Sequence, residues 1–272
     1  MTKFERIINE TTQPSTRDSL LSDLRNLGIN QGDTVMVHIS LSALGYVVDG
    51  KQSVLLASLD AVGDTGTLVM PAQTSSNSDP ENWCMPPIPE PWWQTVRECI
   101  PVFDKHTTPT DIGAVPELFR TYPGTLRSDH PRVSFTARGP LAGQLVSQHV
   151  LTPMFGHDTP LGQLYQLDAK ILMLGTDYDT LTAMHLSEVD SGRSTVSEDA
   201  AAMFVKGKRE WRTFHDYDYG NEDFLAIGQA FEAHGPVTTG KVGMGTAKVV
   251  SYKAIVDFAT DYMKQHPLKP TV

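Results

Sequence analysis

Residues 34–70 contain two short apolar segments separated by a helical one, and this order restricts the possible folds more than any other feature. The segments Thr34–Ile39 and Thr67–Met70 are rich in β-branched and apolar residues, which is typical of buried strands. Residues 51–62, between them, are expected to form a helix. A strand, a helix and a second strand in this order predict the α/β class.

The rest of the chain continues this alternation. We predict helices over residues 16–28, 114–122, 224–234 and 251–265, a strand over 170–175, and a hairpin over 205–212 that turns at Lys206-Gly207-Lys208. The last helix carries an apolar stripe that we expect to pack on the sheet, formed by Tyr252, Ile255, Val256, Ala259, Tyr262 and Met263. Because no repeat or linker separates these elements, we expect residues 1–272 to form a single domain.

Residues 71–110 depart from this pattern. Prolines are frequent there, and the segment holds three of the four tryptophans, Trp83, Trp92 and Trp93. Frequent proline excludes regular helix or central strand throughout the segment. We therefore expect an irregular, ordered insertion at about residues 75–110, with these tryptophans mainly fixing it to the core.

Charge and composition exclude several classes of function. The chain has 22 Lys and Arg against 32 Asp and Glu, a net charge of −10, which repels nucleic acid and anionic lipid and is compatible with a cationic ligand. The charged start MTKFERIINE does not resemble a signal peptide, and apolar runs are too short for a membrane span. The two cysteines, Cys84 and Cys99, fit a reducing compartment. We expect a soluble, cytoplasmic protein that contacts neither nucleic acid nor membrane.

The segment GTDYDTLTAMHLSEVD, residues 175–190, follows a predicted buried strand. Ligands of open α/β sheets bind beyond the carboxyl ends of strands, so a site is expected there. If a helix begins near Thr180, Leu181, His185 and Glu188 share one face, and His185 could act as a general base oriented by a carboxylate. Alternatively, Asp177 and Asp179 cap the helix and His185 fills a polar niche in the core.

Two further segments could bind anions. Residues 125–140 include Arg127, Ser128, His130, Arg132 and Ser134, which could recognise phosphate or pyrophosphate, or could lie in a solvated loop followed by a strand. The loop 40–45 after the first strand offers backbone N–H groups that could cradle an anionic or extended cofactor. The acidic, aromatic loop 215–223 could be a solvated turn or part of a cradle for a polycation.

Other common chemistries lack their motifs. The segment Gly235–Lys241 has the spacing of a phosphate-binding P-loop, but Val242 replaces the required hydroxyl and a predicted helix precedes it. There is no H-E-x-x-H, C-x-x-C or G-x-S-x-G motif, and the cysteines have no identifiable paired base. We expect no metal.

Several segments together resemble the aminoglycoside 3-N-acetyltransferase family, whose members are coenzyme A-dependent. The resemblance covers roughly residues 16–265, and its most specific parts are RSDHPRVSF, residues 127–135, and LGTDYDTLTAMHLSE, residues 174–188. It implies a three-layer α/β/α sandwich around a mixed sheet. It also implies direct acetyl transfer from acetyl-coenzyme A to the 3-amino group of a polycationic aminoglycoside in a ternary complex.

The resemblance also implies roles for individual residues. His185 is the expected general base, with Asp179 and Glu188 as acidic neighbours. The residues expected on the coenzyme A side are His38, Ser40, Leu41, Ser42, Ala43, Leu44, Gly45, Ser128, Arg132 and Ser134. Asp104, Asp190 and Asp218 are expected on the substrate side. The alternatives are a different amine as acceptor, or a non-catalytic protein that binds coenzyme A or aminoglycoside, and the chain could be a monomer or a homodimer.

Overall fold

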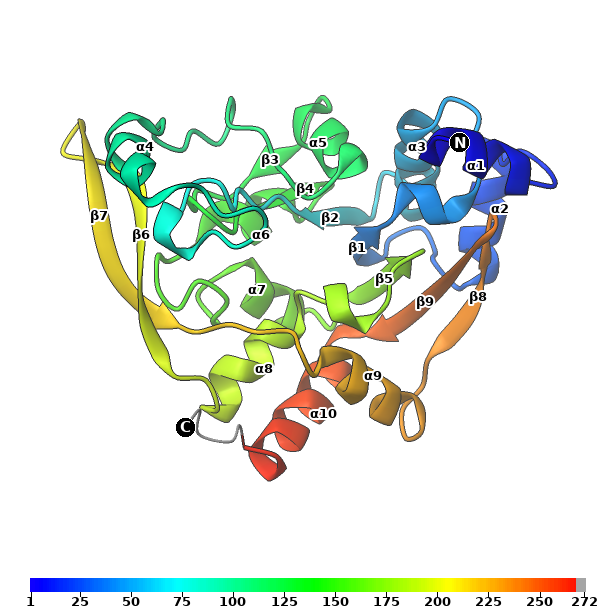
Figure 1. Ribbon diagram of the computed structural model, residues 1–272. Helices are drawn as coiled ribbons and strands as arrows, with labels where there is room; N and C mark the ends of the chain where they lie inside the picture. The colour runs from blue at the N-terminus through cyan, green and yellow to red at the C-terminus, as the bar shows by residue number, and fades with distance from the viewer. Residues whose placement is uncertain (268–272) are drawn as a thin grey trace.

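A seven-stranded mixed sheet forms the centre of the computed structural model, which describes residues 1–267 (Figure 1). The strands, in their order across the sheet, are β3 (Leu126–Arg127), β4 (Phe135–Arg138), β2 (Thr67–Pro71), β1 (Thr34–Ile39), β5 (Lys170–Leu174), β9 (Gly245–Ser251) and β8 (Thr238–Val242). β1 runs parallel to both β2 and β5, and the other pairs are antiparallel. The carboxyl ends of β1 and β5 therefore lie side by side.

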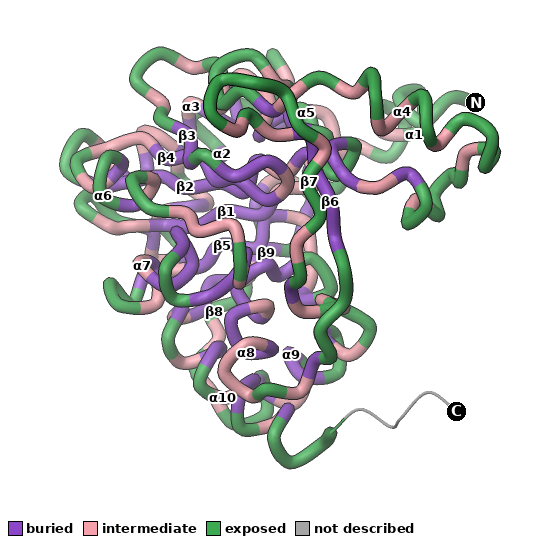
Figure 2. The backbone as a smooth tube through the Cα atoms, turned by 90° about the vertical axis from the view of Figure 1, so that its left-hand side faces the viewer, coloured by how far each residue is buried: buried purple, intermediate pink, exposed green. Residues whose placement is uncertain are grey.

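Helices cover both faces of this sheet, because successive side chains of a strand point to opposite faces. Val35 and Val37 of β1 pack with α2 (Arg17–Asn26), α3 (Lys51–Val62) and α5 (Ala114–Thr121). Met36, between them, belongs to the cluster on the other face, which contains α6 (Ala142–Ser147), α7 (Pro160–Gln166), α8 (Met184–Ser191), α9 (Phe224–Glu232) and α10 (Tyr252–Gln265). Figure 2 shows the buried residues concentrated along the sheet. The predicted α/β class with a mixed sheet is confirmed.

The local signals explain several boundaries. Thr16 caps α2 by accepting a hydrogen bond from the backbone N–H of Ser19, as a residue before the first helical turn should. The apolar stripe of α10 is buried as predicted, except that Tyr262 is only half-buried, and the helix packs mainly against α8. A short first helix, α1 (Lys3–Glu10), precedes the predicted elements.

No helix within residues 1–267 has both the length and the apolar character needed to cross a bilayer.

The segment at 71–110 contains only short helical pieces, which are η2 (Pro80–Asn82), η3 (Glu90–Trp92) and α4 (Trp93–Cys99). Trp83 and Trp93 are half-buried and donate their indole N–H groups to Ser78 Oγ and the Ile88 carbonyl within the segment, whereas Trp92 is exposed. Beside α4 lies a long hairpin that forms a separate two-stranded sheet (Figure 1). Arg209 on that hairpin donates to the carbonyls of Arg97 and Ile100, which joins the two segments.

Two predicted boundaries are wrong. The hairpin consists of β6 (Val196–Val205) and β7 (Lys208–Tyr217), so it is much longer than residues 205–212, although it does turn at Lys206-Gly207. The helix that carries His185 begins at Met184 and not near Thr180. Asp177 and Thr180 instead bond to nearby backbone and close a separate short turn, η4 (Tyr178–Thr180), which leaves Leu181 outside the helix.

Candidate active site

His185 and Glu188 lie one turn apart on α8 and form a hydrogen-bonded pair. The distance between His185 Nδ1 and Glu188 Oε2 is 2.5 Å. Because a carboxylate only accepts hydrogen bonds, Nδ1 carries the hydrogen and donates it. Nε2 is then the ring nitrogen left for a ligand, and it is the nitrogen that can accept a proton. Gly192, at a positive φ of 63°, ends the helix one residue after Ser191.

Glu188 is buried, with only 2% of its surface exposed, yet its carboxylate is fully engaged. Its second oxygen, Oε1, accepts from the backbone N–H of Gly220 at 3.0 Å and from Ser194 Oγ at 3.3 Å. These donors compensate the cost of burying a carboxylate. The His185–Glu188 pair is therefore held in one orientation by hydrogen bonds to both oxygens of the carboxylate.

Aromatic rings surround the His185 imidazole. Phe155 stacks on it at 4.5 Å between ring centroids, Tyr219 meets it edge-on at 5.6 Å, and Phe224 lies tilted at 5.0 Å. These contacts leave the imidazole little freedom to rotate.

The buried Asp216 fixes two of those rings. Its carboxylate accepts from the backbone N–H of Met154 at 2.8 Å, next to Phe155, and from the Tyr219 hydroxyl at 3.2 Å. A third donor is the backbone N–H of Tyr217, at 2.7 Å. Burial raises the pKa of Asp216, and these hydrogen bonds oppose that shift. Asp216 thus connects the end of β7 to both walls of the His185 pocket.

His185 lines two cavities. The first has a volume of about 550 Å³ and lies between the insertion, the hairpin and the 217–221 loop. Glu198, Asp199 and Asp218 line it, while the cation Arg132 forms an ion pair with Asp199. The carboxylates outnumber the cation, so this side of His185 favours a positively charged ligand.

The second cavity, of about 320 Å³, lies at the carboxyl ends of β1 and β5. His38, Thr176 and Thr182 line it together with His185. Burial, with a smaller contribution from the nearby His185, lowers the pKa of His38 to about 4. His38 is therefore neutral at pH 7, and within the described chain its Nε2 is buried without a hydrogen-bond partner.

A third cavity, of about 380 Å³, adjoins the second, because Ile39 lines both. Its wall includes Ser40, Leu41, Ser42 and Gly45 of the loop after β1. That loop packs against Gly175, where an added Cβ would lie 2.7 Å from the Ala43 Cβ. The first and second cavities therefore share His185, and the third cavity shares Ile39 with the second.

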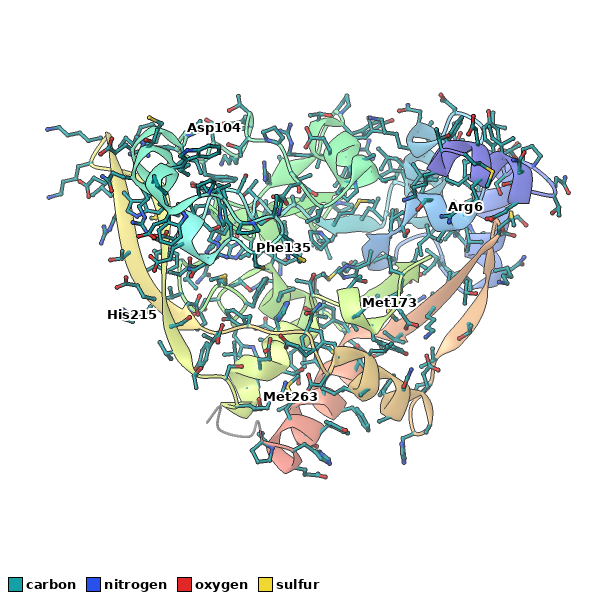
Figure 3. The ribbon with its side chains drawn as sticks, viewed as in Figure 1. Arg6, Asp104, Phe135, Met173, His215 and Met263 are labelled. Atoms are coloured by element: carbon teal, nitrogen blue, oxygen red, sulfur yellow. The ribbon has the colours of Figure 1, made fainter. Side chains whose placement is uncertain are left out.

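The structure brings together some of the predicted site residues. His185 and Glu188 pair as expected. Asp179 is exposed and lines the second cavity, and Asp218 is exposed and lines the first. Asp104 and Asp190 lie elsewhere. Asp104 lines a separate cavity at the outer edge of the insertion (Figure 3), and Asp190 pairs with His157 Nε2 at 2.8 Å.

The predicted coenzyme A residues separate into two groups. His38 and most of the Ser40–Gly45 loop line the second and third cavities, except that Leu44 is buried in the core and Ala43 lines neither. Ser128 and Ser134 are fully buried and present no surface to a ligand. The Ser134 hydroxyl donates to the Ala72 carbonyl and accepts from Arg127 Nε. These two hydrogen bonds hold β4 to the end of β2. Arg132 lines the first, acidic cavity instead.

Sequence reasoning missed Phe155, Tyr219, Asp216 and Asn221. The only signal for Asp216, Tyr219 and Asn221 was the acidic, aromatic composition of residues 215–223, which predicts a cradle but no specific contact, and Phe155 lies outside that segment. Asn221 lines both cavities at His185 and donates to the Asp179 carbonyl at 2.7 Å. In residues 1–267, no group of three His, Cys, Asp or Glu side chains is arranged to hold a metal ion.

Several known proteins with similar sequences are named as aminoglycoside acetyltransferases or as proteins like them. The sequence profile of the family "Aminoglycoside 3-N-acetyltransferase" matches residues 36–264. The SPbeta prophage-derived aminoglycoside N(3')-acetyltransferase-like protein YokD of Bacillus subtilis is 40% identical over 258 residues, which is 94% of this chain and 95% of YokD. Aminoglycoside N(3)-acetyltransferase IX of Micromonospora chalcea is 33% identical over 276 residues, covering 95% of this chain and 96% of that protein.

Solved structures agree with the sequence matches. The crystal structure of YokD has a TM-score of 0.94 and covers 96% of this chain and 98% of its own, at 39% identity. AAC-IIIb in a binary complex with CoASH has a TM-score of 0.83 at 30% identity and covers 96% of this chain and 100% of its own. AAC-VIa bound to sisomicin has a TM-score of 0.83 at 28% identity and covers 94% of this chain and 100% of its own.

Proposed function

The chain belongs to the aminoglycoside 3-N-acetyltransferase family of acyltransferases, and from that membership we propose that it transfers an acetyl group from acetyl-coenzyme A to the 3-amino group of an aminoglycoside. The observation that carries the proposal is the position of the His185–Glu188 pair, at which an acidic cavity meets a second cavity. A base at such a junction reaches one ligand from each side.

The amine substrate belongs in the first cavity. An aminoglycoside is a small polycation, and the carboxylates of Glu198 and Asp218 line this cavity. AAC-VIa, a structural neighbour, binds the aminoglycoside sisomicin, which supports this class of substrate. A carboxylate-rich wall next to His185 would hold the drug with one amine against Nε2.

Acetyl-coenzyme A belongs in the second and third cavities. A long, narrow molecule can occupy two neighbouring cavities, and Ile39 lines both of these. The neighbour AAC-IIIb binds CoASH, which supports the assignment of this co-substrate. His38 lines the second cavity with a neutral imidazole, so the acetyl end would lie beside an uncharged polar side chain.

The residues of this chain can perform a direct transfer. Glu188 holds His185 so that Nε2 removes a proton from the bound ammonium group, and the freed nitrogen pair attacks the thioester carbonyl. The C–N bond forms, the C–S bond breaks, and the sulfur leaves as a thiol with the proton returned by His185. The nitrogen loses its second proton to solvent, so the products are the amide, the thiol and one released proton. Neither Cys84 nor Cys99 lines the cavities at His185, and both lie exposed in the insertion. The proposed reaction therefore has no acyl-enzyme intermediate on a cysteine. We also propose that the enzyme is cytoplasmic, because free exposed thiols persist in that compartment.

The test is thiol release from acetyl-coenzyme A with a panel of aminoglycosides. We expect His185→Ala to lower turnover at least about 10²-fold and to change coenzyme A affinity by less than about threefold. His215→Ala is the control, because His215 is an exposed histidine on the outer hairpin (Figure 3). Activity of His185→Ala within a few-fold of wild type would show that His185 is not the base. Coenzyme A binding without thiol release for any drug would indicate a different amine as acceptor.

A further inference from the structure

The N-terminal helix α1 forms part of the wall of the third cavity. Lys3, Phe4 and Ile7 line that cavity opposite Ser40 and Ser42 of the loop after β1. The family match begins at residue 36, so α1 lies outside it. Nothing in the sequence motifs of the site assigns a role to these three side chains.

Hydrogen bonds attach the chain after α1 to the cavity. The Tyr46 N–H donates to Thr11 Oγ1 at 2.8 Å, the Ser15 N–H donates to the Tyr46 carbonyl at 2.9 Å, and the Val48 N–H donates to the Ser15 carbonyl at 2.9 Å. The rings of Phe4 and Tyr46 lie 6.2 Å apart. The helix is thus held beside the cavity from its carboxyl end.

The helix itself is poorly covered by protein. It has eight residues, none of them buried, and Phe4 is 60% exposed. An isolated helix of this length is marginal in water and needs packing on its apolar face. A molecule that fills the third cavity would supply that packing to Phe4 and Ile7.

The charge of the cavity indicates the chemistry of its occupant. Lys3 is the only charged side chain among the described residues that line it, although the chain as a whole has a net charge of −10. Ile39 also lines the cavity that contains His38 and His185, so the two cavities are neighbours. A molecule that reaches from His185 past Ile39 would place its far end beside Lys3, which attracts an anionic group.

We propose that α1 binds the nucleotide end of acetyl-coenzyme A, with Phe4 and Ile7 against its apolar surface and Lys3 against a phosphate. This inference rests on the proposed function, since it takes acetyl-coenzyme A as the co-substrate. α1 then acts as an outer wall that the co-substrate itself stabilises.

The first experiment is calorimetric titration with coenzyme A and with pantetheine, which lacks the nucleotide. We expect Lys3→Ala and Phe4→Ala each to weaken coenzyme A binding at least about fivefold and to leave pantetheine binding unchanged. Arg6→Ala is the matched control, because Arg6 lies on the same helix, is exposed, and does not line the cavity (Figure 3). It should bind coenzyme A within twofold of wild type.

The second experiment is amide hydrogen exchange over residues 3–10 with and without coenzyme A. We expect saturating coenzyme A to slow exchange in α1 at least about tenfold, and pantetheine to leave it unchanged. Wild-type affinity in both variants, an equal loss for coenzyme A and pantetheine, or unchanged exchange would each overturn the role of α1. In those cases wild type still binds coenzyme A. If wild type bound no coenzyme A at all, the proposed function itself would fail.

Discussion

His185 Nδ1 and Glu188 Oε2 lie 2.5 Å apart, and the carboxylate that holds the ring is almost completely buried. The other carboxylate oxygen accepts from Gly220 and Ser194, which belong to segments that follow α8 in the chain. The orientation of the base therefore depends on contacts between α8, the residues just after it and the 217–221 loop.

Glu188→Gln tests this orientation. An amide can still accept from His185 Nδ1, but its NH₂ group would then face the Gly220 N–H and Ser194 Oγ, so one set of donors loses its acceptor. We expect turnover to fall at least about tenfold, with little change in coenzyme A affinity. Asp190→Asn is the control, because Asp190 is on the same helix and pairs with His157 instead. Equal activity of the two variants would exclude Glu188 as the orienting group.

Asp218→Asn and Glu198→Gln test the acidic cavity. Both side chains are exposed and line it, so each should attract a polycation through a partly screened interaction. We expect each change to raise KM for an aminoglycoside about 1.5- to 5-fold, and less so in high salt. Steady-state kinetics at two ionic strengths provides the measurement, with Asp104→Asn as control. If KM for the drug stayed constant in both variants, the drug would have to bind elsewhere.

Asp216→Asn tests the link between the hairpin and the His185 pocket. The asparagine would turn an NH₂ group toward at least one of the donors Met154 N–H, Tyr217 N–H and Tyr219 O–H. We expect a loss of roughly 1.5–3 kcal/mol in the free energy of unfolding, together with lower turnover. Denaturant titration and thiol release on the same sample check both effects. Full stability with full activity would show that these hydrogen bonds are dispensable.

Three buried histidines make stability depend on pH. Burial lowers the pKa of His38 and of His149 to about 4, and it lowers that of His130 well below its ordinary 6.5. When the chain unfolds, these groups titrate near 6.5 again. Between pH 6.5 and 4 the unfolded chain therefore binds protons that the folded chain does not, so stability is complete above this window and falls as the pH falls through it.

Each such histidine contributes a slope of up to about 1.4 kcal/mol per pH unit. We expect the free energy of unfolding to decrease between pH 7 and pH 5. His149→Gln should reduce the slope of that free energy against pH by the contribution of one histidine. Comparison of slopes removes the effect of any general destabilisation. An unchanged slope in the variant would mean that His149 does not titrate on unfolding.

The sequence predicted the central strands β1, β2 and β5 well because their signals are local, whereas it did not predict β3, β8 and β9. β1 and α3 have the predicted bounds, since a β-branched run and an apolar segment between Gly50 and Gly63 do not depend on distant residues. The helix start near Thr180 failed because Asp177 and Thr180 bond to neighbouring backbone, which periodicity does not report.

The site was predictable only in part, for a related reason. His185 and Glu188 lie three residues apart, so one turn of helix brings them together. Asp216 and Met154 are 62 residues apart, and only the folded hairpin and loop place the carboxylate against the backbone N–H. Ser128 and Ser134 have the residue types of an anion site, but their burial is a property of the complete sheet.

Gly228→Ala tests the packing between α9 and Tyr178, which supports the wall of the second cavity. Gly228 lies in α9, and a Cβ there would approach the Tyr178 ring to 1.9 Å. Tyr178 is fully buried in η4, next to Asp179, so the ring has little room to move. Overpacking of this kind costs roughly 1–3 kcal/mol, which exceeds the gain of up to about 1 kcal/mol from replacing a helical glycine by alanine.

We therefore expect a lower free energy of unfolding and, because η4 and Phe224 of α9 line the cavity, a higher KM for acetyl-coenzyme A. Gly143→Ala in α6 is the matched control, because within residues 1–267 a Cβ there meets no atom outside its own helix backbone within 4 Å, and it should be neutral or slightly stabilising. If denaturant titration ranked the two variants alike, the close contact between α9 and Tyr178 would not be what holds the second cavity in shape.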